Sequence, residues 1–75
     1  MTVWILNISH RHGIDTWVCA SEDRAYQRLI QYVDEWWDRE MENTPRPTDN
    51  NISVEKYFSN AQDEWWSIDF SEVLT

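Results

Sequence analysis

Residues 21–42 constrain the fold most, because their apolar side chains recur at the period of an α-helix. At about 100° per residue, the apolar and the polar side chains fall on opposite halves of such a helix. Ser21 is a favourable N-cap residue, and Glu22 and Asp23 follow it where the helix dipole stabilises negative charge. Glu40 is the exception, an acid that projects onto the apolar half. The pattern predicts a long helix that buries one face against another layer.

Residues 2–19 predict a β-hairpin that precedes this helix. Side chains alternate between two faces in residues 2–8, and both faces are apolar near the start, which suits a central strand. Residues 14–19 alternate in the same way and predict the returning strand. The intervening loop, residues 9–13, ends at Gly13, the only glycine in the chain. A hairpin loop commonly needs one residue at positive φ, where glycine has no steric cost.

The second half of the chain predicts a loop, a short helix and a third strand. The loop, residues 43–52, contains two prolines, which end the long helix. Ser53 is the expected N-cap of a short helix over residues 53–62. Residues 64–70 alternate again, which predicts the third strand, placed most simply beside the first. The side chains expected to face inward from it are Trp66, Ile68 and Phe70.

The order strand, strand, helix, helix, strand predicts a single small α+β domain over residues 1–75. Its fold class is a three-stranded antiparallel sheet (ββααβ order), with the long helix packed on one face and a short second helix. The second face of so small a sheet is expected to stay exposed and to carry Val3, Trp17 or Trp65. Trp17 and Trp65 share their strand faces with polar residues, so they are the aromatics expected to be most exposed.

The cellular setting is constrained by the cysteine content and by the apolar runs. Cys19 is the only cysteine, which excludes an internal disulfide and favours a reducing compartment. The start of the chain lacks the basic region of a signal peptide. No stretch approaches the ~18 apolar residues of a membrane span. The expected location is the cytoplasm, without membrane association.

The net charge of −8 lies entirely in the second half of the chain. Residues 1–33 contain three basic and three acidic side chains, whereas residues 34–75 contain three basic and eleven acidic ones. The second half also holds four of the six tryptophans. Such a chain is repelled by phosphate backbones and anionic lipids, but it is attracted to basic proteins. The expected partner is a basic protein, and direct binding of nucleic acid is disfavoured.

The long helix breaks two electrostatic preferences. Asp34 and Asp38 repel each other at i,i+4, and several acids crowd the last turns, where the dipole favours cations. Sequences that break such local rules often do so at functional sites. The residues predicted to bind the partner are Asp34, Glu35, Asp38, Glu42, Asp63, Glu64, Trp65 and Asp69.

Metal or nucleophilic chemistry has weaker support. His10 and His12 have the spacing of a ligand pair, but zinc needs three or four ligands and only Asp15 and Cys19 lie nearby. A catalytic cysteine requires an electropositive setting, whereas Cys19 is followed by two acids. The sequence predicts no catalytic residues, no metal and no cofactor. A small His/Cys metal-binding protein stays open as an alternative.

The segment Ile-Ser-His-Arg-His-Gly-Ile-Asp at residues 8–15, followed by Ser21, Glu22 and a helix, resembles the start of short uncharacterised bacterial and mobile-element proteins. That resemblance covers about the first third of the chain. It implies a hairpin-then-helix fold and brings no assigned activity. In its size and acidity the chain is also similar to anti-CRISPR and anti-restriction proteins. Those proteins are commonly non-enzymatic, and many occupy a basic nucleic-acid groove.

These observations predict a non-enzymatic acidic binding protein that blocks a basic, nucleic-acid-binding surface of a nucleic-acid-handling effector. Its carboxylates would then act as a nucleic-acid mimic, as in an anti-CRISPR or anti-restriction inhibitor. One alternative is a self-associating structural domain, a homodimer joined through an exposed strand edge. The charge could also serve solubility alone.

Overall fold

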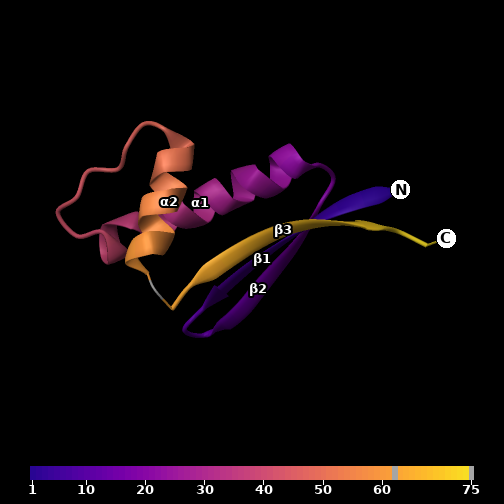
Figure 1. The fold of residues 1–75 in the computed structure, drawn as a ribbon, viewed down its shortest axis with the longest axis horizontal. Coiled ribbons are helices and arrows are strands. Elements are labelled where there is room, and N and C mark those ends of the chain that lie inside the picture. The colour runs from indigo at the N-terminus through magenta and orange to yellow at the C-terminus, as the bar shows by residue number, and fades with distance from the viewer. Residues whose placement is uncertain (62, 75) are drawn as a thin grey trace.

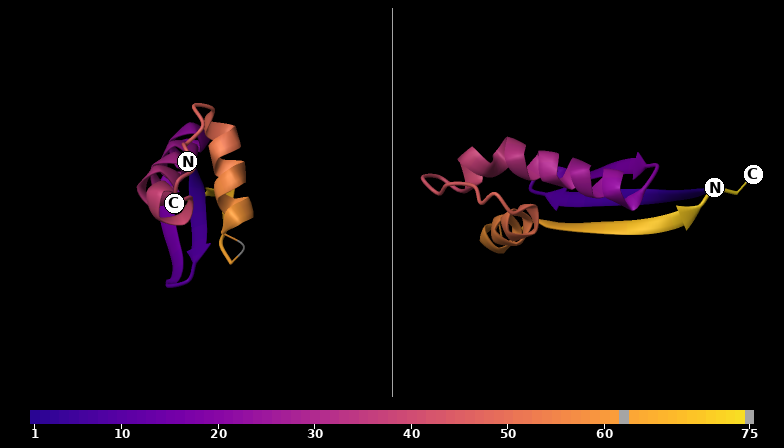
Figure 2. Two further views of the ribbon diagram at one scale, coloured as in Figure 1. Left: turned by 90° about the vertical axis from the view of Figure 1, so that its left-hand side faces the viewer. Right: turned by 90° about the horizontal axis from the view of Figure 1, so that it is seen from above.

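The computed structural model describes residues 1–61 and 63–74 and confirms the predicted α+β fold (Figure 1). In chain order its elements are β1 (Thr2–His10), β2 (Gly13–Cys19), α1 (Glu22–Glu40), α2 (Asn50–Asn60) and β3 (Trp65–Glu72). Both helices lie on one side of the sheet, and α2 packs beside α1 near the start of β3 (Figures 1 and 2). Neither of these two helices combines the length and apolar character that a membrane crossing requires.

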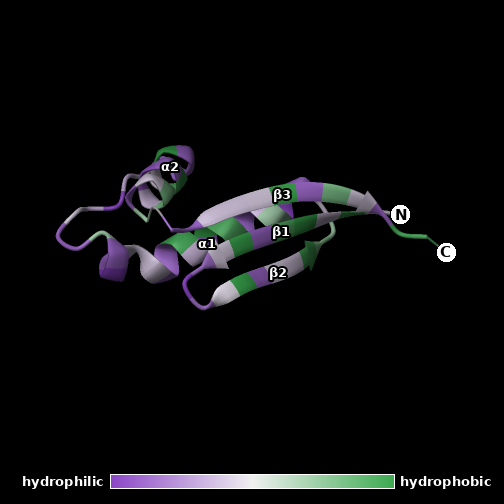
Figure 3. Ribbon diagram, turned by 60° about the horizontal axis from the view of Figure 1, so that its bottom comes forward, coloured by the Kyte–Doolittle hydropathy of each residue, from purple (hydrophilic) through white to green (hydrophobic). Residues whose placement is uncertain are grey.

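The sheet has the order β2-β1-β3, so β1 is its central strand and both neighbours run antiparallel to it. The register places Leu6 opposite Trp17 on one side and opposite Ile68 on the other. β3 therefore lies beside the first strand, as expected, and β2 and β3 are both edge strands. Apolar and polar residues alternate along the strands (Figure 3).

The core lies between the central strand and the two helices. Its fully buried members include Leu6, Ile8, Leu29, Val33 and Tyr57. α1 begins where the sequence predicts, because the Ser21 hydroxyl accepts a hydrogen bond from the backbone N–H of Arg24 at 3.2 Å. The expected apolar half of this helix supplies most of its buried side chains.

The start of α2 differs from the prediction. Asp49, not Ser53, is the N-cap, and its carboxylate accepts from the backbone N–H of Ile52 at 3.0 Å. Ser53 is buried inside the helix, where its hydroxyl donates to the carbonyls of Asp49 and Pro47, each at 3.0 Å. Both residue types make good caps, so the local sequence does not choose between them. The predicted end at residue 62 lies outside the described residues.

We call the sheet face away from the helices the open face. Trp65 lies on it and is 50% exposed, as predicted, and Val18 of β2 is 67% exposed there. The prediction for Trp17 was wrong: it lies opposite Leu6 on the helix-facing side and is half-buried. The Arg28 guanidinium covers its ring at 4.6 Å from the centroid. Register across strands, which the sequence of one strand does not contain, decides this placement.

Phe70 also departs from expectation. It lies on the helix-facing side opposite Trp4, yet it is 68% exposed. The two rings contact each other at a centroid separation of 5.6 Å. This end of the sheet extends past the helices, so a residue on the covered face still meets solvent (Figure 1).

The Gly13→Ala substitution should lower the free energy of unfolding by about 1–3 kcal/mol. Gly13 has a φ of 129°, which L side chains rarely adopt. A Cβ built there meets nothing within 4 Å, so the loss comes from backbone strain alone. Urea denaturation measures it. Asn43→Gly, at a φ of 62°, is the matched control and should change stability by less than about 0.5 kcal/mol. Equal stability of Gly13→Ala and the parent would contradict the claim that a side chain at position 13 strains the backbone.

Candidate functional site

The molecule is hollowed on both sides of α1, and the two hollows differ in charge. The first, the β3 groove, consists of adjoining recesses of about 550 Å³ and about 440 Å³ that share Tyr26 and Trp66. The second, the hairpin groove, has a volume of about 460 Å³ and lies between α1 and the β1–β2 turn.

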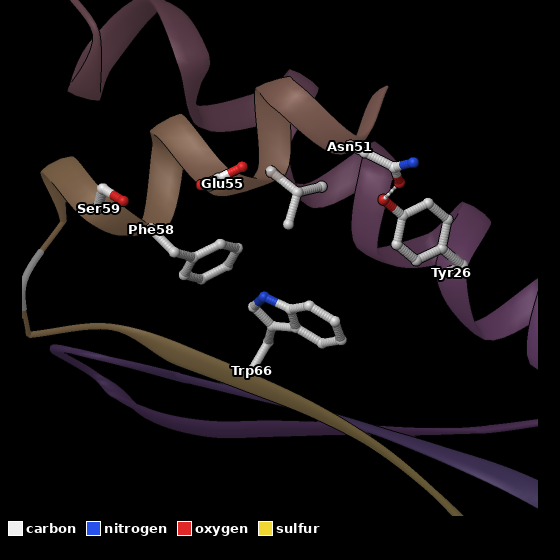
Figure 4. A pocket seen from close by; sticks show the side chains of 7 residues that line it. Tyr26, Asn51, Glu55, Phe58, Ser59 and Trp66 are labelled. Carbon is white, nitrogen blue, oxygen red and sulfur yellow. Dashed lines mark hydrogen bonds between the residues drawn. The ribbon is translucent and has the colours of Figure 1, made fainter. Parts of the chain in front are cut away.

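Aromatic rings form the floor of the β3 groove. Trp66 rises from β3, Tyr26 comes from α1 and Phe58 from α2, and their rings face a common space (Figure 4). The Tyr26 hydroxyl donates to the Asn51 side chain, which ties α1 to the first turn of α2. Burial, with a smaller contribution from the charge of Asp49, raises the pKa of the Tyr26 phenol. The groove therefore has a floor assembled from three elements.

Acids form the rim of the β3 groove. Glu22 and Asp23 stand at the start of α1, and Glu55 stands on α2 above the rings. All three are exposed. Among the described residues, no lysine, arginine or histidine lines either recess. An apolar floor with an uncompensated negative rim suits a basic ligand whose side chains have apolar stems.

The hairpin groove has a mixed lining. Its cationic or titratable bases are Arg11, Arg28, Arg39, His10 and His12, and its acids are Asp15, Glu35, Glu40 and Glu64. Arg28 and Arg39 lie over the rings of Trp17 and Trp36, at 4.6 Å and 5.1 Å from the ring centroids. The charges in this groove thus largely compensate one another, in contrast to those of the β3 groove.

Two of the arginines in the hairpin groove also pair with acids. Arg28 lies 3.8 Å from the Glu35 carboxylate, and Arg11 lies 3.9 Å from that of Glu40. The second pair gives a partner to Glu40, the one acid that the helical pattern placed among apolar residues. In each pair one of the two side chains is largely exposed, so each pair contributes little to stability.

His10 has no ring nitrogen free for a metal. Its Nε2 lies 2.8 Å from the Asp15 carboxylate, and its Nδ1 accepts from the backbone N–H of His12 at 3.2 Å. Cys19 lies opposite Trp4, at the other end of β2, roughly 20 Å from the turn. Within residues 1–61 and 63–74, no three His, Cys, Asp or Glu side chains gather as a metal site requires.

Glu64 lines the hairpin groove, and its carboxylate is directed toward two buried phenols. One of its carboxylate oxygens accepts from the hydroxyl of Tyr32 at 2.6 Å and from that of Tyr57 at 3.3 Å. Burial is the main cause that raises the pKa of both phenols, and the nearby Glu64 charge adds to it. Glu64 is thus engaged in the core, which leaves it poorly placed for the partner contact predicted from the sequence.

The structure does not bring the predicted partner-binding residues onto one surface. Asp34 pairs with Arg46, and Glu35 pairs with Arg28. Asp38 and Glu42 are exposed, and neither forms a salt bridge within the described part of the chain. The others lie elsewhere: Asp63 is exposed just before β3, and Trp65 and Asp69 lie on the open face.

Sequence reasoning missed the β3 groove. Glu22 and Asp23 were explained by the helix dipole, and Trp66 by the inward face of its strand. Glu55 was not singled out at all. These residues share a site only because β3 lies at the edge beside β1 and α2 crosses near its start. No local pattern in the sequence records that arrangement.

Stability should fall as the pH rises above about 10, the pKa of an unfolded tyrosine. The folded state raises the pKa of Tyr32 and Tyr57, so it favours the neutral phenols. The contribution of the two phenols to the free energy of unfolding is complete below that pH. Above it, this free energy falls by up to about 1.4 kcal/mol per phenol and pH unit. Urea denaturation from pH 8 upward should show this slope, and Tyr32→Phe with Tyr57→Phe should flatten it. An unchanged slope in the double variant would contradict the assignment.

No family model, curated protein or solved structure matches this chain. Its function must therefore be inferred from its own surface, where the described lining of the β3 groove contains acids and no base.

Proposed function

We propose that this chain is a non-enzymatic cytoplasmic binding protein that covers a basic, nucleic-acid-binding surface of a protein partner. The observation that carries the proposal is the β3 groove, whose rim is acidic and whose described lining contains no base. Under this proposal the chain is an inhibitor, because it occupies the surface that the partner uses for phosphate backbones.

The groove has the chemistry to hold lysine and arginine side chains. Their methylene stems pack on aromatic rings, and their charged heads reach carboxylates at the edge of the same recess. Rings at the floor also attract cations through their faces. Tyr26 and Trp66 provide the rings, and Glu22 and Glu55 stand above them from different helices. A basic segment would meet both features at once.

The acids outside the grooves are proposed to attract the partner from a distance, and not to contact it in the complex. Asp38 lies near the end of α1 and Glu42 lies just after it, and both are exposed and outside both grooves. With a net charge of −8, they contribute to a field that steers a basic partner toward the molecule. Such steering acts on the association rate and is weakened by salt. In this proposal, the carboxylates that imitate a nucleic acid are those of the β3 groove, in place of the helix acids predicted from the sequence.

Neutralising the rim should weaken binding of a basic peptide about fivefold or more. The variant Glu22→Gln with Glu55→Gln removes two rim charges. Its matched control, Asp38→Asn with Glu42→Gln, removes two charges at and just beyond the end of α1, outside the grooves. Calorimetry with an eight-residue peptide that alternates arginine and valine, capped at both ends, provides the affinities. Equal loss in both variants would show that net charge alone attracts the peptide and would refute a site in the β3 groove.

The same two variants serve as baits for the natural partner. In a nuclease-treated lysate of the source cells, the parent and the control should retain a nucleic-acid-binding protein that high salt releases. The rim variant should retain much less of it. The isolated partner should then lose nucleic-acid binding when the chain is added. A partner that binds nucleic acid equally well with the chain present would refute the inhibitory role.

Self-association is the second candidate, and the edge strand β2 favours it. Ile14 and Val18 of this strand are 58% and 67% exposed on the open face. A second copy could pair along this edge and cover both side chains. Sedimentation at high protein concentration decides the matter. A dimer that is lost on Val18→Lys would establish it, and a monomer throughout would exclude it.

A further inference from the structure

We infer that the partner segment binds as an added strand, hydrogen-bonded to the outer edge of β3. This inference rests on the proposed function, and it specifies the conformation of the segment and the atoms that hold it. Three observations carry it: the backbone groups on that edge, the position of the β3 groove along it, and the charge around it.

The outer edge of β3 offers a row of free backbone groups. In the described part of the chain, β3 pairs with β1 only. The backbone N–H of Val73 donates to the carbonyl of Met1 at 2.8 Å, and these two residues are opposite each other in the register. In an antiparallel pair such hydrogen-bonded positions alternate with non-bonded ones. The N–H and C=O groups of Trp66, Ile68 and Phe70 therefore point outward, toward solvent.

The β3 groove lies on the same side as these three residues. Trp66 and Ile68 face the helices, and both line the groove. Residues of an added strand that pair with them would direct their side chains into the same space, because directly opposed residues share a face. Tyr26 and Phe58 stand there to receive them. The alternate side chains would fall on the open face, beside Asp69 and Trp65.

Charge selects a basic segment over a second copy. Glu22 and Asp23 lie beside the β3 groove, on the helix-covered side of the sheet. Asp69 is exposed on the open face. Two β3 edges brought together would place like charges side by side, which is destabilising. A segment with lysine or arginine meets carboxylates on both faces. Strand addition of this kind combines main-chain hydrogen bonds with pockets for alternate side chains.

The other edge of the sheet provides an internal control. The β1–β2 register closes at His10 opposite Gly13, so the outward-facing backbone groups of β2 belong to Ile14, Thr16 and Val18. Asp15, the acid of this strand, lies 2.8 Å from His10. The β2 edge thus offers the same hydrogen bonds, but the groove beside it contains three arginines and the acid of the strand is paired. A basic strand should therefore choose β3.

Amide hydrogen exchange measured by NMR tests the inference with the capped arginine–valine peptide. Saturating peptide should slow exchange at Trp66, Ile68 and Phe70 by at least about tenfold, since each N–H gains a partner. Ser67 and Asp69 already donate to β1 and should change little, as should Thr16 and Val18 on the other edge. Binding without this alternation would overturn strand addition while leaving the proposed function intact. A peptide that fails to bind at all would overturn both.

Two N-methylated peptides make the test independent of exchange rates. One carries methyl groups on every arginine amide and the other on every valine amide, so charge and side chains are unchanged. In an added strand only one of the two sets faces β3. One peptide should lose at least about tenfold in affinity, and the other should bind within about twofold of the parent. Equal affinity of both methylated peptides with the parent would overturn the main-chain pairing.

Discussion

The buried phenol of Tyr32 connects the sheet, both helices and the segment before β3. Its ring stacks on His10 of β1 and contacts Trp36 of α1, and from α2 it meets Tyr57 and Phe58. Its hydroxyl reaches the carboxylate that directly precedes β3. One residue thereby joins both ends of the chain to both helices. Because that hydrogen bond is partly buried and its acceptor is a carboxylate, losing either partner would leave a polar group with one hydrogen bond fewer at the edge of the core.

A second constraint is that two helices cover only one face of a three-stranded sheet. The layer arrangement leaves an open face and two edges, and the charge distribution divides the roles of those edges. Around β2 and the turn, the arginines pair with carboxylates or lie over aromatic rings. In the β3 groove the lining acids have no ion-pair partner among the described residues. The same net charge therefore has different consequences on the two sides of α1.

Much of the fold could be predicted, because its helices and strands follow from the spacing of apolar residues that are close in the sequence. The helical face of residues 21–42, the Ser21 cap and the turn at Gly13 each depend on a few neighbouring residues. The start of α2 could not be predicted, because Asp49 and Ser53 are both good N-cap residues. Contacts with other parts of the chain decide between them. Trp17 was misplaced because its face depends on the register with β1. The β3 groove requires three distant segments, and no local period encodes their meeting.

The acids beside β3 also bear on how the molecule stays dispersed. An uncovered edge strand is a template for pairing with any other edge, and charged side chains are a common protection against it. Asp69 and Glu72 provide that charge on this strand. Like charges on two β3 edges repel each other, while the row of backbone groups stays open to a strand of opposite charge. The charge that favours a basic segment at this edge therefore also opposes strand pairing between copies, so exposed Asp69 bears both on aggregation and on the choice of partner.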